Sequence, residues 1–454
     1  MRDDKLLLHF ARNGAYGPDG AELVVMERGE GPYLFDTNGR RYVDGLSNLF
    51  CAQIGYSYGE EIAAAASTQL TQLAFHTNWG TAHPRALELA EKLVELAPDG
   101  FGRVFFTSGG SEAVEAAWKI VRQYHVANGE PERRKAIARN IAYHGVTLGA
   151  LSFTGVPRFK DVFGPPAVPT RHVSNTNPFR SPEQGEALTK RLLDEMEGAI
   201  LAEGPETVAM IIAEPVQNAG GCLQPPPGYW AGLRKLADRF GILLVADEVI
   251  SGCGRLGEWF GVTRFDAVPD LMTIAKGLTS AYAAMGAVVV SDRVAAPLYD
   301  AKTTLLHGIT FGGHPVSAAI ALQNIEIFER DGVLENVRRL EPYLRDRLET
   351  LRELPIVGDV RGSGFFWAVE FVKDDDNTRL TPDECERLLR GFLPGRLLEA
   401  GLIARADDRG DAVLQIAPPL IADEAVLDEI VDAMRATLVD AGAFLGVGAA
   451  KSVA

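Results

Sequence analysis

Lys276 ends an apolar run, which is an unusual place for a lysine. The stretch DLMTIAKGLTS, residues 270–280, places four apolar residues between positions 271 and 275, a pattern typical of a strand buried on both faces of a parallel sheet. Lysine is rarely buried, because its ammonium loses water that a core cannot replace. A desolvated amine with a lowered pKa is a nucleophile suited to Schiff-base formation. The alternative is a lysine whose ammonium reaches from the strand end to solvent.

Asp247 is a second charged residue at the end of an apolar run, but its charge is negative. In ILLVADEVISGCGRLG it follows five apolar residues, so a strand delivers a carboxylate into a place poor in water. Such a group needs a cationic partner, and a protonated heterocyclic nitrogen would serve. An ion pair with a neighbour such as Arg255 is the competing interpretation. If the strand continues, Val249 projects to the same side as Asp247 and can press on a flat ring.

Two further segments suit an anion and a ring. In TSGGSEAVEAAWK, Gly110 and Ser111 follow a strand and open a helix, which predicts free backbone N–H groups that could bind a phosphate. The alternative is an ordinary helix start, with Ser111 as the N-cap and Glu112 in the first turn. In IAYHGVTLGA, Tyr143 follows a strand and could stack on a planar ligand, although simple packing explains an isolated tyrosine equally well.

Ligands of open α/β sheets bind at the carboxyl ends of the strands, where these groups fall. A phosphate cradle, a carboxylate for a pyridinium, ring-stacking groups and an amine for an aldehyde together match pyridoxal 5'-phosphate (PLP). From GPYLFDTNGRRYVDGLSN to IAPPL, nearly the whole chain resembles the class III (subgroup II) aminotransferases of PLP fold type I, which are aspartate aminotransferase-like. The motifs that carry the resemblance are GSEA, YHG, AEPV, ADEVISGCGR, AKGL and HGITFGGHP.

The resemblance implies a role for each matching residue. Lys276 would form the Schiff base and shuttle a proton, and Asp247 would keep the pyridine nitrogen protonated; these two are the catalytic residues. Thr310 matches a residue that reaches the phosphate of the neighbouring subunit, so a homodimer with shared active sites is implied, with a tetramer made of two such dimers as the alternative. The other cofactor-binding residues implied are Gly110 and Ser111 at the phosphate, Tyr143 and Val249 on the ring faces, and Glu214 beside the ring.

Four positions bear on substrate preference. Ornithine and acetylornithine transaminases carry a glutamate where AEPVQNAGGC has Ala219, and there it pairs with a mobile arginine. Arg405 resembles the flexible arginine of ω-transaminases, which binds a carboxylate or swings away; a solvated loop arginine is the alternative. Phe50 stands where those enzymes place a bulky aromatic against the substrate, and Tyr143 would also contact it.

The resemblance therefore implies an ω-transaminase that moves an amino group from an ω-amino acid or primary amine to a keto acid, such as pyruvate, by a ping-pong mechanism. Other class III enzymes stay open: a 4-aminobutyrate or diamine:2-oxoglutarate transaminase, an aminomutase or a decarboxylase. The physiological donor, the choice between pyruvate and 2-oxoglutarate, and any swing of Arg405 are left undecided by the sequence.

The elements that position these residues alternate short apolar strands with amphipathic segments, which predicts an α/β fold with a mostly parallel sheet and helices on both faces. We expect a large PLP-binding domain at residues 60–330 and a smaller α+β domain formed by both chain ends, 1–59 and 331–454, with a hairpin turn at Asn38-Gly39. Strands are predicted at 103–106, 136–139, 208–214, 242–248, 271–275 and 286–290.

Composition narrows the functional classes. The 454 residues carry a net charge of −16, which argues against nucleic acid as a partner. The four cysteines are widely spaced, which matches neither a metal site nor a disulfide scaffold. No targeting or membrane-spanning segment is visible, so a cytoplasmic protein without a membrane partner is expected.

Overall fold

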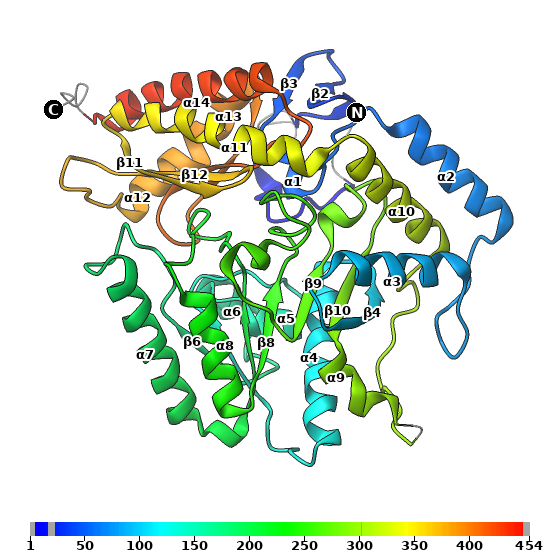
Figure 1. Ribbon diagram of the computed structural model, residues 1–454. Helices are drawn as coiled ribbons and strands as arrows, with labels where there is room; N and C mark the ends of the chain where they lie inside the picture. Colours follow the sequence, from blue (N-terminus) through cyan, green and yellow to red (C-terminus); the bar gives the residue numbers. More distant parts are fainter. Residues whose placement is uncertain (1–4, 17–22, 301, 448–454) are drawn as a thin grey trace.

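The fold is built on a seven-stranded sheet (Figure 1) in a computed structural model that describes residues 5–16, 23–300 and 302–447. Its strands, in spatial order, are β4 (Phe101–Thr107), β10 (Gly286–Ser291), β9 (Leu271–Ile274), β8 (Leu243–Asp247), β7 (Val208–Ala213), β5 (Lys135–Arg139) and β6 (Thr170–Val173). The sheet is mostly parallel, but β10 runs antiparallel to both of its neighbours. Each predicted strand is present within a few residues of its expected bounds, whereas β6 was not predicted.

Helices cover both faces of this sheet because its strands are apolar on both sides. Neighbouring residues of one strand, such as Leu243 and Leu244 of β8, are both fully buried but belong to different apolar clusters. One cluster includes residues of α3 (Pro84–Leu96), α7 (Gly185–Glu203), α8 (Tyr229–Phe240) and α10 (Pro315–Arg330). The other includes residues of α4 (Gly110–Ala127), α5 (Leu148–Phe153) and α9 (Asp292–Ala295). This is the fold of PLP fold type I enzymes.

The two chain ends meet in smaller sheets beside the large one. One has the order β1 (Met26–Glu30), β2 (Tyr33–Asp36), β3 (Arg41–Asp44) and β13 (Leu402–Ile403); the other has β11 (Val357–Ser363), β12 (Phe366–Phe371), β15 (Val413–Ile416) and β14 (Arg405–Asp407). The predicted hairpin joins β2 to β3, and Gly39 adopts a φ of +80° in its turn. Strand β13 pairs with β3, so residues near both ends share a sheet. The domain boundaries at 59/60 and 330/331 stay predictions that this pairing supports.

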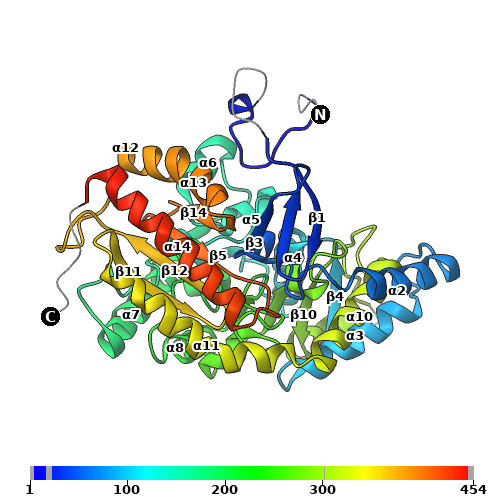
Figure 2. The same ribbon diagram turned by 90° about the horizontal axis from the view of Figure 1, so that it is seen from above.

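Helices pack over these smaller sheets. Figure 2 shows α11 (Val333–Glu349) and α14 (Glu424–Leu445) running side by side, and the apolar residues of α14 that the sequence places in a stripe are buried. The remaining helices are α1 (Ser47–Phe50), α2 (Gly59–Gln72), α6 (Pro157–Phe163), α12 (Pro382–Cys385) and α13 (Leu393–Glu399). Among the helices of the described residues, none combines the length and apolarity needed to cross a membrane.

Candidate active site

A cavity of about 420 Å³ opens where β8 and β9 end and α4 begins. This is the edge at which ligands bind in open α/β sheets, because the connections there diverge to either face. The structure brings most of the predicted site residues together at it. Those that line the cavity are Gly110, Ser111, Tyr143, Glu214, Asp247, Val249 and Lys276.

Lys276 enters the cavity from a strained turn at the end of β9. Its φ is +25°, which is costly for a residue with a side chain and is found where the surroundings enforce it. Gly277 follows because a Cβ there would lie 2.4 Å from Nε2 of Gln53. Burial lowers the pKa of the Lys276 amine, although Cys51 and Asp247 oppose that change. Burial therefore makes the amine easier to deprotonate to its nucleophilic form than it is in water.

Asp247 is 4% exposed and is held by three groups. Nδ1 of His144 lies 2.7 Å from one carboxylate oxygen, while the Thr273 hydroxyl and the Val249 backbone N–H each donate to the other at 3.1 Å. The predicted alternative, an ion pair with Arg255, is wrong. Arg255 instead donates to the carbonyls of Phe365 and Pro418 and to the Ser47 hydroxyl.

His144 is the functional neighbour that sequence reasoning missed. It is buried, lines the cavity and orients the Asp247 carboxylate, yet its Nε2 has no hydrogen-bond partner among the described residues. The signal was present in the motif YHG, beside Tyr143. Gly145 completes that motif because its φ is +113° and a Cβ would lie 2.4 Å from the Ser111 hydroxyl oxygen.

Glu214 forms hydrogen bonds to two chain segments at the wall of the cavity. One carboxylate oxygen accepts the backbone N–H of Tyr143 at 3.2 Å, and the other accepts that of Asn218 at 2.8 Å. Burial raises the pKa of this carboxyl group, while His144 and Arg139 act against that rise. Glu214 therefore fixes the two segments that carry Tyr143 and Ala219, and its side chain stays at the cavity surface.

The first turn of α4 is open toward the cavity. Gly109 is the N-cap and provides no side-chain cap, so the expectation that Ser111 caps the helix is wrong. The Ser111 hydroxyl accepts the Val146 N–H at 3.2 Å instead, and Glu112 accepts the Ser108 N–H at 2.8 Å. Uncapped N–H groups at a helix N-terminus are suited to an anion such as a phosphate.

Three predicted site residues lie outside the lining of this cavity. Phe50 is 1% exposed and packs edge-on against Phe366, with the ring centroids 5.7 Å apart, while its neighbour Cys51 faces the cavity. The Arg405 guanidinium lies 5.9 Å from the centre of the Phe50 ring, and burial lowers the pKa of Arg405 to about 10. A solvated loop arginine is therefore not what the structure shows. Thr310 is exposed, in the loop before α10.

These groups fit PLP. The open helix start suits its phosphate, the amine of Lys276 suits its aldehyde, and the tethered carboxylate of Asp247 suits a pyridinium nitrogen. A larger residue at position 110 would press on Val249, since a Cβ there would come within 3.0 Å of the Val249 side chain. Fold and site together define a PLP-dependent enzyme of fold type I.

Comparison with known proteins specifies the family. The model of the aminotransferase class-III family matches residues 16–438. A "probable aminotransferase" of Mycobacterium tuberculosis is 49% identical, with 96% of this chain and 93% of that protein covered. Putrescine–pyruvate aminotransferase of Pseudomonas aeruginosa is 37% identical, with 92% and 91% covered. The ω-transaminase of Pseudomonas jessenii, solved in complex with PMP, superposes with a TM-score of 0.91 at 36% identity and 98% coverage of both chains.

The chain therefore belongs to the class III aminotransferases, and its cofactor is PLP.

Proposed function

We propose that this aminotransferase moves the amino group of an ω-amino acid or primary amine to pyruvate in two half-reactions on one site. The observation that carries the proposal is Arg405, whose guanidinium lies beside the cavity against Phe50 with no ion pair among the described residues. A cation that is free to bind or to leave a carboxylate suits a site that takes a keto acid and an uncharged amine in turn. The putrescine–pyruvate aminotransferase among the relatives supports this pairing of substrates.

The residues of the cavity divide the chemistry among them. Bound PLP supplies the electron sink that makes loss of a proton from the substrate carbon feasible. Lys276 would provide the amine that anchors the cofactor and then moves this proton, a task for which a lowered pKa is suited. Asp247, oriented by His144, would hold a proton on the ring nitrogen. Tyr143, Val249, Gly110 and Ser111 line the cavity; the first two would enclose the ring, and the start of α4 at the other two would hold the phosphate.

The absence of an acid at position 219 supports the uncharged-amine half of the proposal. Ala219 is fully buried and presents no carboxylate to an arginine. Arg405 would therefore change partner by moving between a substrate carboxylate and the face of Phe50. A 4-aminobutyrate or diamine donor with 2-oxoglutarate as acceptor is the second candidate. A γ-aminobutyrate transaminase of Solanum lycopersicum, 36% identical, supports such a donor, and a diaminobutyrate–2-oxoglutarate transaminase of Halomonas elongata, also 36% identical, supports such an acceptor.

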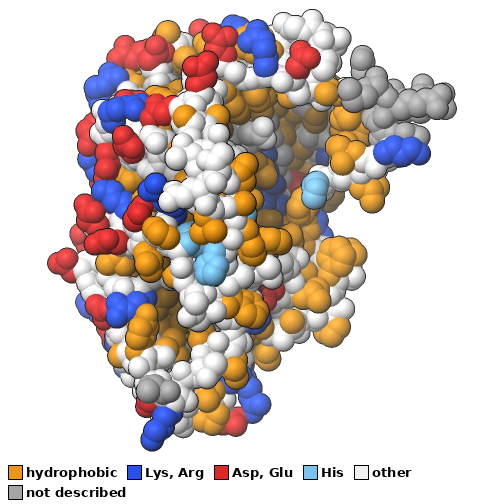
Figure 3. Space-filling model, turned by 90° about the vertical axis from the view of Figure 1, so that its right-hand side faces the viewer, with side chains coloured by type: hydrophobic (Ala, Val, Ile, Leu, Met, Phe, Trp, Pro, Cys, Tyr) orange, Lys and Arg blue, Asp and Glu red, His pale blue; other side chains and the backbone are white. Residues whose placement is uncertain are grey.

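We further propose a homodimer with shared active sites. Thr310 lies in an exposed loop with large apolar neighbours, Leu306 at 85% and Phe311 at 60% exposure, and Trp79 beside them is 63% exposed. Leu306 and Trp79 line a groove of about 860 Å³, and Figure 3 shows hydrophobic side chains gathered on this side of the molecule. An apolar surface of this kind is typical of subunit contacts. Pairing of dimers into a tetramer and a cytoplasmic location stay predictions.

A donor panel with the purified, PLP-loaded enzyme tests the proposal. Candidate ω-amino acids, diamines and simple amines are each offered with pyruvate and with 2-oxoglutarate, and the aldehyde or ketone product is measured. We expect turnover only when a keto acid is present, with pyruvate preferred. Turnover without a keto acid would indicate an aminomutase or a decarboxylase, and a strict preference for 2-oxoglutarate would favour the second candidate.

A further inference from the structure

The segment RADDRGD, residues 405–411, concentrates charge beside the cavity, and its acids are held by arginines other than Arg405. Asp408 pairs with Arg158 at 3.1 Å and with Arg390 at 2.5 Å. Asp411 pairs with Arg379 at 2.5 Å and lies 3.7 Å from Arg180.

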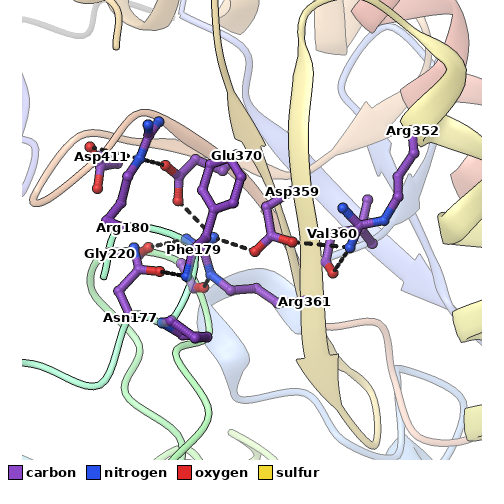
Figure 4. Close-up of polar contacts among 12 residues, drawn as sticks. Asn177, Phe179, Arg180, Gly220, Arg352, Asp359, Val360, Arg361, Glu370 and Asp411 are labelled. Carbon is purple, nitrogen blue, oxygen red and sulfur yellow. Dashed lines mark hydrogen bonds and ion pairs between the residues drawn. The ribbon is translucent and has the colours of Figure 1, made fainter. Parts of the chain in front are cut away.

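The Asp411 end of the segment belongs to a buried network that fixes the chain there. Figure 4 shows Arg180 reaching Glu370 and Arg361 reaching Asp359 and Glu370. Arg361 also donates to the carbonyl of Gly220, at 2.6 Å, in the loop that follows Glu214. The acids at this end are thus committed to structural contacts, and Asp411 is not available to Arg405.

Asp407 is the acid best placed to pair with Arg405, yet another arginine occupies it. The two residues lie two apart on β14, so their side chains project from the same face of the strand. However, Nε of Arg409 lies 2.9 Å from each oxygen of Asp407, and its Nη2 lies 2.8 Å from one of them. Both partners are buried, with 5% of Asp407 and 6% of Arg409 exposed. The carboxylate is therefore satisfied without Arg405.

We propose that Arg409 determines substrate specificity by holding Asp407, which prevents Arg405 from closing an internal ion pair and leaves it available for the carboxylate of a keto acid. The inference rests on the proposed function, in which Arg405 receives that carboxylate. Arg409 acts at the wall of the site, because its guanidinium lies 5.3 Å from the centre of the Tyr143 ring, which lines the cavity.

The electrostatics agree with this role. Burial is the main cause that lowers the pKa of Arg405, and the positive charge of Arg409 lowers it further, while Asp407 opposes both. A half-buried guanidinium beside a second cation gains most from an incoming anion. Removal of Arg409 would therefore remove the positive charge that repels Arg405 and would leave Asp407 without its partner. Both changes would draw Arg405 toward Asp407.

The test compares Arg409→Gln with the double variant Asp407→Asn/Arg409→Gln. We expect Arg409→Gln to raise KM for pyruvate about tenfold, the effect of losing one charged hydrogen-bond partner. The amine half-reaction, followed by cofactor absorbance with a carboxylate-free primary amine, should change less than about twofold, because this substrate makes no use of Arg405. The double variant should restore KM for pyruvate, because no acid remains to capture Arg405.

Controls separate the possible failures. Arg409→Lys keeps a positive charge beside Asp407 and should therefore raise KM for pyruvate less than Arg409→Gln does. Thermal unfolding of each PLP-loaded variant shows whether the fold persists. If Arg405→Ala raises KM for pyruvate but Arg409→Gln does not, or if the double variant fails to restore it, the role of Arg409 is refuted alone. If Arg405→Ala itself leaves KM unchanged, the proposed role of Arg405 fails first.

Discussion

The floor of the cavity, which we define by Asp247 and Lys276, and the segment at residues 405–411 both contain charged groups. They differ in whether the group that would act on a ligand is held by fixed partners. On the floor, the carboxylate of Asp247 has fixed partners, and the register of the sheet sets one of them: Thr273 lies directly across from Asp247 in the β8–β9 pair. At residues 405–411 the acids are also taken, but Arg405 has no ion-pair partner among the described residues. Cofactor chemistry needs groups that do not move, whereas two alternating substrates need one that can.

The difference follows from where each set of residues lies. The floor residues end central strands of a seven-stranded sheet, covered by helices on both faces. Arg405 begins β14, a three-residue strand at the edge of a four-stranded sheet. An edge strand has neighbours on one side only, so its side chains are less constrained. Substitutions on the floor should therefore damage every reaction, whereas those at Arg405 should separate one substrate from the other.

The largest effect is expected for Lys276→Ala. Loss of the amine removes both the anchor of the cofactor and the group that moves the proton, so turnover should fall by at least about 10⁴-fold. Cofactor binding should remain measurable, because the phosphate and ring contacts persist. Steady-state rates and equilibrium binding of PLP check the two halves of this expectation.

Chemical labelling supplies the matching control. Borohydride treatment of the PLP-loaded parent enzyme should place a pyridoxyl group on the peptide that contains Lys276, and the alanine variant should lack it. A label on another lysine of the parent enzyme, or retained turnover in the variant, would contradict the assignment.

The next effect is expected for Asp247→Asn, with Glu248→Gln as its matched control. An amide cannot hold a proton on the ring nitrogen, so kcat should fall by about 10²- to 10³-fold for amine and keto acid alike. Glu248 is the adjacent buried acid, but its carboxylate accepts the backbone N–H groups of Gly261 and Val262, outside the cavity. Its substitution should lower stability more than rate. Similar kinetic losses in both variants would mean that Asp247 acts only through packing.

Arg405→Ala should lower the rate with pyruvate and have little effect on the rate with a simple amine. We expect kcat/KM for pyruvate to fall by about 10- to 100-fold, as for a lost charged hydrogen bond, while the half-reaction with a simple amine changes less than about threefold. Arg379→Ala is the control, since this arginine pairs with Asp411 and its side chain is 60% exposed. Equal losses for both substrates would show that Arg405 does not provide the switch.

Sequence patterns predicted the floor far better than the residues around Arg405. Apolar runs reveal central strands, and chemistry-bearing residues at their ends fall at one edge of the sheet, so Lys276 and Asp247 could be placed together in advance. Strand β6 was missed because its sequence, TRHV, is short and mostly polar. The partner of Asp247 was missed because His144 is 103 residues away, and no local pattern encodes such a pair. The same holds for Phe50, whose burial against Phe366 depends on tertiary packing.

The smallest effect is expected at Arg12 and Glu386, an ion pair next to Arg390, which lies 3.5 Å from Glu386 and also pairs with Asp408. Their contact is 2.6 Å, but the side chains are 70% and 44% exposed, so water and salt screen the attraction. Hydrogen bonding to Arg12 is the main cause that lowers the pKa of Glu386 below its usual value. A lowered pKa means that the contribution to stability is present at neutral pH and is lost as the pH falls through the pKa of the folded state. Arg12→Gln should therefore lower the unfolding temperature by less than about 1 °C at pH 7 in low salt.

That small difference should disappear when the pH falls well below the ordinary pKa of a glutamate, about 4.3, and in 1 M salt, because protonation or screening removes the same attraction that the substitution removes. Thermal unfolding of parent and variant at the two pH values and two salt concentrations measures it. A larger shift that persists in high salt would show that Arg12 stabilises the fold through packing. In that case fixed charges would also occur outside the cavity floor and residues 405–411, because the exposed Arg12 would be held as firmly as the groups on the floor.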